Sequence, residues 1–401
     1  MMGLIWWFII VGYWLVGGIL AFIVAYLLIL TGAAFFARRT TPVRANPTTR
    51  FVIMIPAHNE ERLLPDLLTN LNQLDYPREL YTVHVVADNC TDRTAAVAKA
   101  HGAIVHERFD QTLRGKGYAL EWLLQQIWDR NEPHDAVVIL DADSVVSTNF
   151  LRVMDTRLAR GERVIQAYYA VRQPEGAWSA GIRAVALIVL HYLRPLGRMV
   201  LGGSTGLKGN GMVFAADILR RHRWTASLTE DIEYHMRLIL AGERAMFAPD
   251  AIVWAEMPDS LRTAQTQNER WERGRMEMIR HYVPHLLREG LRRRSFLLID
   301  AAIEQLIPPF SVVTGLSILV LFIALILRDP SALAMASFIL VGQIIYILSG
   351  LFLVRAPWPI YRSLLFTPFF IIWKLWLYVR LLLGIKPHDW IRTARNRAPR
   401  S

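Results

Sequence analysis

Long apolar stretches occupy both ends of the chain, and short ones alternate with polar segments in the region between them. Leu4–Phe36 contains no charged residue and is longer than the roughly 20 residues that span a bilayer. Gln305–Leu327 and Ser331–Val354 are also free of charge, and a short Arg-Asp-Pro turn separates them. The pattern therefore predicts a membrane-spanning helix within residues 1–37 and a pair of spanning helices near the C-terminus.

A further apolar segment, Ser363–Gly384, carries Lys374 and Arg380, so it spans the membrane, re-enters it or lies in its interface. The positive-inside bias places the arginines after the first apolar stretch in the cytoplasm, together with the region that follows them. The tail, residues 385–401, is also basic. Because four full spans would leave that tail outside, we expect a cytoplasmic tail and a re-entrant or interfacial Ser363–Gly384.

The central region alternates short β-branched runs with helical stretches, which predicts an α/β domain over residues 45–290 with a mostly parallel sheet. The expected strands are Phe51–Ile55, Thr82–Ala87, Ala103–His106, Val137–Leu140 and Val164–Ala170. The expected helices are Glu60–Gln73, Thr91–His101, Tyr118–Asp129 and Asn149–Arg160.

Composition supports a membrane protein and argues against a nucleic-acid partner. The chain is 53% hydrophobic and has a net charge of +11, but many basic residues flank apolar segments, where anionic lipid headgroups explain them. Trp178–Leu201 and residues 262–304 mix basic and apolar positions and are expected to lie on the membrane surface. A buried core helix is the alternative for Trp178–Leu201. The single cysteine excludes an intramolecular disulfide.

Polar residues gather where the predicted strands end. Pro56–Glu61 follows the first strand, where Asn59 could cap the next helix, and Asp88 begins a polar turn after the second. Arg114-Gly115-Lys116-Gly117 is a flexible basic turn that suits a diphosphate or solvent. Asp141-Ala142-Asp143 follows the fourth strand, and such a pair can hold a divalent cation that binds a diphosphate. Two aspartates at such a junction can also serve only to form a turn.

Further motifs follow in order: Gly209–Phe214, Thr229-Glu230-Asp231 and Gln267-Asn268-Glu269-Arg270-Trp271. With the stretches VVADNCTDRTA, RGKGYALEWLL, VVILDADSVV and IQAYY, this ordered set resembles the membrane-integrated family 2 glycosyltransferases of the GT-A fold. Cellulose, hyaluronan, chitin and poly-N-acetylglucosamine synthases belong to that family, and the likeness is greatest to its exopolysaccharide-synthesis branch. The resemblance covers Phe51 to Arg275.

The resemblance implies roles for the donor side of the site. Asp88 would bind the uracil of a UDP-sugar, and Lys116 would offset diphosphate charge. Asp141 and Asp143 would hold Mg²⁺ or Mn²⁺. The remaining residues implied for nucleotide-sugar binding are Pro56, Ala57, His58, Glu60, Gln267, Arg270 and Trp271.

It also implies roles for the acceptor side. Asp231 matches the general base of an inverting transfer, and Glu230 would support it. Gly209 and Gly211 would form a floor beneath the acceptor, on which Trp271 could stack. A helix cap by Thr229 and Asp231 is the alternative for that motif. An amphipathic interface helix is the alternative for Gln267–Trp271.

The function implied is a hexosyl or N-acetylhexosaminyl transfer from a UDP-sugar to a growing β-linked exopolysaccharide, by an integral protein of the bacterial inner membrane with a cytoplasmic catalytic domain. The alternative is addition of one sugar to a polyisoprenyl phosphate or a lipid-linked oligosaccharide. A catalytically silent subunit would have lost carboxylates that are present here. Large processive synthases usually have more C-terminal spans, so an oligomer or an export partner would be needed to complete a conduit.

Overall fold

A computed structural model of the chain describes residues 2–174, 178–224, 229–256 and 261–382. Its centre is an eight-stranded sheet with the order β3-β2-β1-β4-β7-β6-β8-β5. The strands are β1 (Phe51–Ala57), β2 (Tyr81–Asp88), β3 (Ile104–Arg108), β4 (Ala136–Ile139), β5 (Ser144–Val146), β6 (Val164–Val171), β7 (Met212–Ala215) and β8 (Ala245–Ala255).

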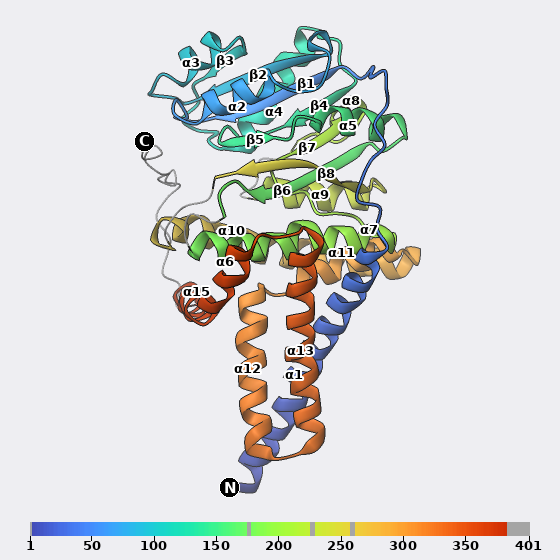
Figure 1. Cartoon of the computed structure of the whole chain (residues 1–401), viewed down its shortest axis with the longest axis vertical. Helices are drawn as coiled ribbons and strands as arrows, with labels where there is room; N and C mark the ends of the chain where they lie inside the picture. Colours follow the sequence, from blue (N-terminus) through green and yellow to red (C-terminus); the bar gives the residue numbers. More distant parts are fainter. Residues whose placement is uncertain (1, 175–177, 225–228, 257–260, 383–401) are drawn as a thin grey trace.

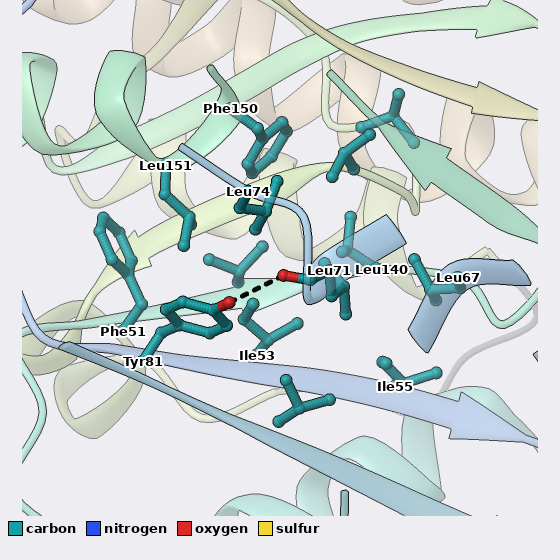
Figure 2. Packing of buried hydrophobic residues seen from close by; sticks show 14 of the residues in the cluster. Phe51, Ile53, Ile55, Leu67, Leu71, Leu74, Tyr81, Leu140, Phe150 and Leu151 are labelled. Atoms are coloured by element: carbon teal, nitrogen blue, oxygen red, sulfur yellow. Dashed lines mark hydrogen bonds between the residues drawn. The ribbon is translucent and has the colours of Figure 1, made fainter. Parts of the chain in front are cut away.

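Successive residues of the strands pack into two separate hydrophobic cores, one on each face of the sheet. Phe51, Ile53 and Ile55 of β1 pack on the first face. Figure 2 shows this core, where the Tyr81 hydroxyl donates to the carbonyl of Leu71 at 2.8 Å. The helices of this face are α2 (Leu64–Leu71), α3 (Thr94–Ala100) and α5 (Phe150–Ala159), and those of the other face are α4 (Lys116–Asp129), α8 (Ala216–Arg221) and α9 (Glu230–Leu240). Because successive side chains point to opposite faces, helices pack on both sides of the sheet, and the α/β domain has three layers: helices, sheet and helices.

The prediction of a mostly parallel sheet is confirmed, with two strands reversed. β1, β2, β3 and β4 pair in parallel, and β6 pairs in parallel with β8. β7 runs antiparallel to both β4 and β6, and β5 runs antiparallel to β8. The sequence did not suggest β5, β7 or β8. β5 and β7 have three and four residues, too few for a visible alternation. The result is a mixed sheet.

Below the sheet lies a layer of helices that run across the molecule in Figure 1. They are α6 (Trp178–Ile188), continued through the π-helical turn η2 (Val189–Leu193) into α7 (Arg194–Val200), then α10 (Leu261–Arg293) and α11 (Phe296–Leu306). Of the apolar window in Ser179–Val200, 78% is buried inside the protein. The segment predicted as Trp178–Leu201 is therefore mostly packed within the protein, as its buried-helix alternative requires.

Three long apolar helices, α1 (Met2–Phe35), α12 (Phe310–Leu327) and α13 (Pro330–Leu353), extend together away from this layer (Figure 1). Each is long and apolar enough to cross a membrane, as is Ser179–Val200. α12 begins at Phe310 rather than Gln305, because α11 ends at Leu306 and a proline pair follows. The Tyr13 hydroxyl of α1 donates to the carbonyl of Ala332 in α13 at 2.7 Å.

The segment predicted as Ser363–Gly384 consists of the end of α14 (Trp358–Ser363), the 3₁₀ turn η3 (Leu364–Phe366) and α15 (Thr367–Leu382). Figure 1 shows α15 running across the direction of α12 and α13, beside the helical layer. How this segment meets the membrane stays a prediction. The basic tail, residues 385–401, lies outside the described residues.

Buried ion pairs fasten α7 to α11 and to the long helices. Arg198 binds the Asp300 carboxylate with Nε at 2.8 Å and Nη2 at 2.6 Å, and the Tyr26 hydroxyl donates to the same carboxylate at 2.7 Å. Arg194 donates to the Tyr346 hydroxyl at 2.7 Å and to Glu304 at 3.3 Å. Because a buried charge that loses its partner is costly, these pairs hold the layer and the long helices in one arrangement.

Candidate active site

The loops that follow β1 and β2 are fastened to each other by side chains. Asn59, with a φ of 57°, accepts a hydrogen bond from the backbone N–H of Thr91 at 2.7 Å through its side-chain oxygen. The backbone N–H of Glu60 donates to the Thr94 hydroxyl at 2.8 Å. The expectation that Asn59 caps the next helix is wrong, because its side chain is bonded to Thr91 and α2 begins only at Leu64. The two loops instead form one fixed wall at the carboxyl edge of the sheet.

Asp88 ends β2 beside this wall and is 7% exposed. Its Oδ1 accepts hydrogen bonds from Arg108 at 2.6 Å and from the Asn89 amide at 3.2 Å. Within the described residues no protein donor meets Oδ2, so this oxygen can accept an N–H from a bound base. The His58 ring lies against the same residue, with Nδ1 2.7 Å from the Asp88 carbonyl oxygen. Pro56 and Ala57 precede it as the last residues of β1.

Lys116 joins the side of the site that is expected to bind the donor to the opposite side. It is the first residue of α4, and its Nζ lies 2.5 Å from Asp141 Oδ1 and also donates to the carbonyl of Gly209. The backbone N–H of Asp141 donates to the Asn210 side chain at 3.1 Å. The end of β4 and the glycine loop before β7 are therefore connected through one ammonium group and one amide.

Both predicted glycines have positive φ angles, 75° for Gly209 and 67° for Gly211, which other residues rarely adopt. A Cβ on Gly209 would lie 3.2 Å from Asp231 Oδ2 and 3.6 Å from Lys116 Nζ. A Cβ on Gly211 would lie 2.6 Å from the Val253 side chain. Gly209 thus leaves open the space beside the Asp231 carboxylate. At Gly211, a side chain would collide with Val253, so only glycine fits there.

Glu230 and Asp231 begin α9 at this opening. The helix-cap alternative fails for Thr229, which makes no side-chain capping bond. Burial raises the pKa of Asp231, while the positive charges of Lys116 and Lys208 oppose the shift. Burial and the neighbouring Asp231 charge raise the pKa of Glu230 to about 7. A carboxylate with a raised pKa at a helix start is a suitable proton acceptor near neutral pH.

Asp141 and Asp143 are presented at the end of β4, the first with about a third of its side chain exposed and the second 7% exposed. No group of three or more potential ligands of the His, Cys, Asp and Glu types gathers anywhere in the described part of the chain. Two carboxylates suffice for Mg²⁺ or Mn²⁺ when substrate phosphates and water complete the coordination. The residues present therefore fit a cation that arrives with a diphosphate.

The predicted Gln267–Trp271 motif lies in helix α10. Trp271 is 43% exposed. One turn further along, a Cβ on Gly274 would lie 2.9 Å from the Thr229 hydroxyl, so α10 passes close to the start of α9. This contact brings the Trp271 end of the helix toward the two carboxylates. The side chains of Gln267 and Arg270 lie outside the described residues.

Sequence reasoning missed Lys208, Asn210 and Gln166. The Gln166 side chain donates to the carbonyl of Asn210 at 2.8 Å and accepts from the backbone N–H of Lys208 at 2.9 Å, so it fixes the glycine loop. Burial lowers the pKa of Lys208 to about 8, and the charges of Glu304 and Asp231 work against this shift. The Gly-Leu-Lys-Gly-Asn-Gly pattern signalled a turn but did not identify a lysine facing the carboxylates.

Comparison with known proteins gives this geometry a family context. The profile of the family described as "Glycosyltransferase like family 2" matches residues 47–274, which include all the site residues described above. The chain is 27% identical over 300 residues to the beta-monoglucosyldiacylglycerol synthase of Nostoc sp., with 66% of this chain and 61% of that protein covered. It is 22% identical over 274 residues to the poly-beta-1,6-N-acetyl-D-glucosamine synthase of Staphylococcus aureus, with 67% and 63% covered.

Among solved structures, the mannosyltransferase of Pyrobaculum calidifontis in complex with GDP-Man and Mn²⁺ is similar with a TM-score of 0.44 and 19% identity. The alignment covers 81% of this chain and 98% of that one. The first two curated relatives are each matched over only 61% of their own length.

Proposed function

The chain belongs to glycosyltransferase family 2 and has its GT-A fold, and from this premise we propose that it transfers a sugar from a UDP-sugar to an acceptor hydroxyl with inversion at the anomeric carbon. The observation that carries the proposal is the convergence of four residues from separate elements. Asp231 lies beside Gly209, the Gly209 carbonyl accepts from Lys116, and Lys116 binds Asp141. This arrangement supports a proton acceptor at Asp231 opposite an edge that would bind the diphosphate.

In the proposed reaction, Asp231 accepts the proton of the acceptor hydroxyl as the oxygen attacks the anomeric carbon. A bond forms between that oxygen and the carbon, and the bond from the carbon to the diphosphate oxygen breaks. The electron pair leaves with UDP, and Lys116 offsets its charge. Asp141 and Asp143 would hold Mg²⁺ or Mn²⁺, which supplies Lewis-acid stabilisation of the leaving group when bound. Asp88 would orient the uracil.

The proposed setting is a membrane surface. α1, α12 and α13 would cross the bilayer, with the catalytic domain on the cytoplasmic side of the bacterial inner membrane. α10 and α15 would lie at the headgroups, so that Trp271 and the opening beside Asp231 face an acceptor arriving from the membrane. Arg39, which follows α1, donates to the Leu353 carbonyl at the end of α13 at 3.4 Å. This hydrogen bond supports a placement in which α1 and α13 end at the same depth in the membrane.

A growing β-linked polysaccharide is the first candidate acceptor, because the Gln267–Trp271 motif in α10 is the pattern of processive relatives. A single addition to a lipid acceptor is the second. It is favoured by the small bundle of three long helices within the described residues, which offers little surface for a polymer conduit without an oligomer or an export partner. The sizes of the radiolabelled products separate the two, since a ladder of long products requires repeated addition.

The experiment that tests the reaction compares Asp231→Asn with wild type. Transfer should fall by about 10²- to 10⁴-fold because the variant cannot accept a proton. UDP binding measured by calorimetry should remain, since Asp231 contacts the acceptor side. Glu230→Gln is the matched control and should retain more activity than Asp231→Asn. Undiminished transfer by Asp231→Asn would refute the assignment of the base.

A further inference from the structure

A small cavity of about 200 Å³ opens where α1 leaves the helical bundle and α7 ends. Two arginines, Arg38 after α1 and Arg157 of α5, meet apolar side chains there, and none of the described residues that line it is acidic. The apolar lining that matters is Leu196, Met199 and Val200 of α7 and Phe247 of β8. A cationic edge above an apolar floor suits an amphiphilic anion.

The two arginines differ in how firmly they are held. Arg157 is fixed by Glu162, with Nη1 2.8 Å from Oε2, and its Nε donates to the Thr41 hydroxyl at 3.3 Å. Arg38 is exposed, and no ion pair or side-chain hydrogen bond involves it within the described residues. Its guanidinium is therefore available to an external anion, and arginine binds phosphate in a bidentate manner.

The surroundings of the cavity favour a lipid over a soluble anion. Arg38 is three residues beyond the end of α1, beside Phe36, which is 84% exposed. On the other side, Val200 and Leu201 at the end of α7 are 44% and 40% exposed. Exposed apolar side chains next to an arginine at the end of a long apolar helix are typical of the headgroup level of a bilayer.

We propose that this cavity binds the phosphodiester of an anionic glycerophospholipid. Arg38 would contact the phosphate, the glycerol would rest on Leu196 and Met199, and the acyl chains would leave over Phe36 and Val200. The proposal assumes the membrane placement of α1 described above but does not depend on the reaction.

The cavity is connected to the candidate active site by a short piece of chain. α7 ends at Val200, the Met199 carbonyl accepts a hydrogen bond from Arg244 at 3.1 Å, and the loop from Gly202 leads directly to Lys208 and Gly209. A Cβ on Gly203 would lie 2.5 Å from the Asp300 carboxylate, so this loop is tightly packed. A lipid that holds the end of α7 would therefore steady the loop beside Asp231 and raise the rate of transfer.

The test uses the full chain in nanodiscs of phosphatidylcholine alone or of an equimolar mixture with phosphatidylglycerol. Lipid retained after transfer to detergent is measured by native mass spectrometry, and UDP release is measured in the discs. Wild type should retain phosphatidylglycerol preferentially and release UDP several-fold faster in the mixed discs. Arg38→Gln should lose both effects while keeping the rate found in phosphatidylcholine. Val200→Asp, which places a negative charge at the cavity mouth, should do the same.

Arg220→Gln is the matched control. Arg220 is also an exposed arginine, but it lies on α8, which packs on the opposite face of the sheet from α5 and its Arg157. It should behave as wild type. Equal phosphatidylglycerol retention by wild type and Arg38→Gln would overturn the proposal, as would full activation by inorganic phosphate in phosphatidylcholine discs. If no UDP release occurred in any disc, the proposed reaction would fail, whereas lipid retention would still test the cavity.

Discussion

The proposed donor side and the proposed acceptor side of the site are constructed differently. The donor wall consists of neighbouring loops, where Asn59 binds Thr91 across 32 positions and Asp88 binds Arg108 across 20. On the acceptor side, Lys116 binds the Gly209 carbonyl across 93 positions. The donor wall therefore depends on local turns of a parallel sheet, whereas the acceptor side depends on the folding of the whole domain. Variants on the two sides should accordingly change donor binding and transfer to different degrees.

Among the variants that compare the two sides, the largest effect is expected at Lys116, where they meet. Lys116→Met removes the cation that binds Asp141. The value of kcat/KM should then fall by about 10²- to 10³-fold, the usual cost of removing one preorganised group that stabilises charge in a transition state. Lys99→Met is the control, because Lys99 is an exposed lysine on α3. Steady-state UDP release measures both variants, and equal rates for the two would remove Lys116 from the mechanism.

The pH dependence of transfer tests the carboxylates of the acceptor side. Burial raises the pKa of Asp231 and that of Glu230, the latter to about 7. The proposed base, Asp231, works only when deprotonated, so kcat/KM should increase with pH over a range that lies above the usual pKa of an aspartate. In Lys116→Met this rise in kcat/KM should move to higher pH, since the lysine charge lowers the pKa of Asp231. A wild-type profile that stays flat down to about pH 5 would contradict this interpretation.

A smaller effect is expected at the glycine beside the base. Gly209→Ala places a methyl group 3.2 Å from Asp231 Oδ2 and strains a φ of 75°, so transfer should fall by about tenfold. Gly102→Ala is the matched control, because Gly102 has a φ of 80° with open space around its Cβ position. Both variants should lose about 1 kcal/mol of stability in urea unfolding. Equal activity losses would attribute the effect to strain alone.

The smallest effect is expected on the donor wall. Arg108→Gln removes the ion pair with Asp88, which is held at 2.6 Å. The carboxylate should become less well oriented, so KM for the UDP-sugar should rise by roughly 3- to 10-fold, the value of about one ordinary hydrogen bond. The value of kcat should change little. If Arg108→Gln lowered kcat and left KM unchanged, the proposed division, in which the donor wall governs donor binding and the acceptor side governs transfer, would be wrong.

The contrast also explains what could be predicted from the sequence. Strands β1 to β4 and β6 were predicted from their apolar runs, and the loops after β1, β2 and β4 from the polar turns that follow. β5 and β7 were not visible, because three or four residues paired in antiparallel carry no pattern of their own. Asp88, Lys116, Asp141 and Asp231 were identified through a resemblance. Lys208, Asn210, Gln166 and Arg108 were not, because their contacts depend on tertiary packing that no local pattern records.

The most direct test of the central claim is the anomeric configuration of the product formed from an α-linked UDP-sugar. A panel of UDP-sugars is first screened for UDP release by wild-type protein with Mg²⁺ or Mn²⁺, and the product of the active donor is then examined by NMR. The account predicts metal-dependent release with a β-linked product, and neither with Asp231→Asn. An α-linked product, or release that persists in Asp231→Asn, would contradict it.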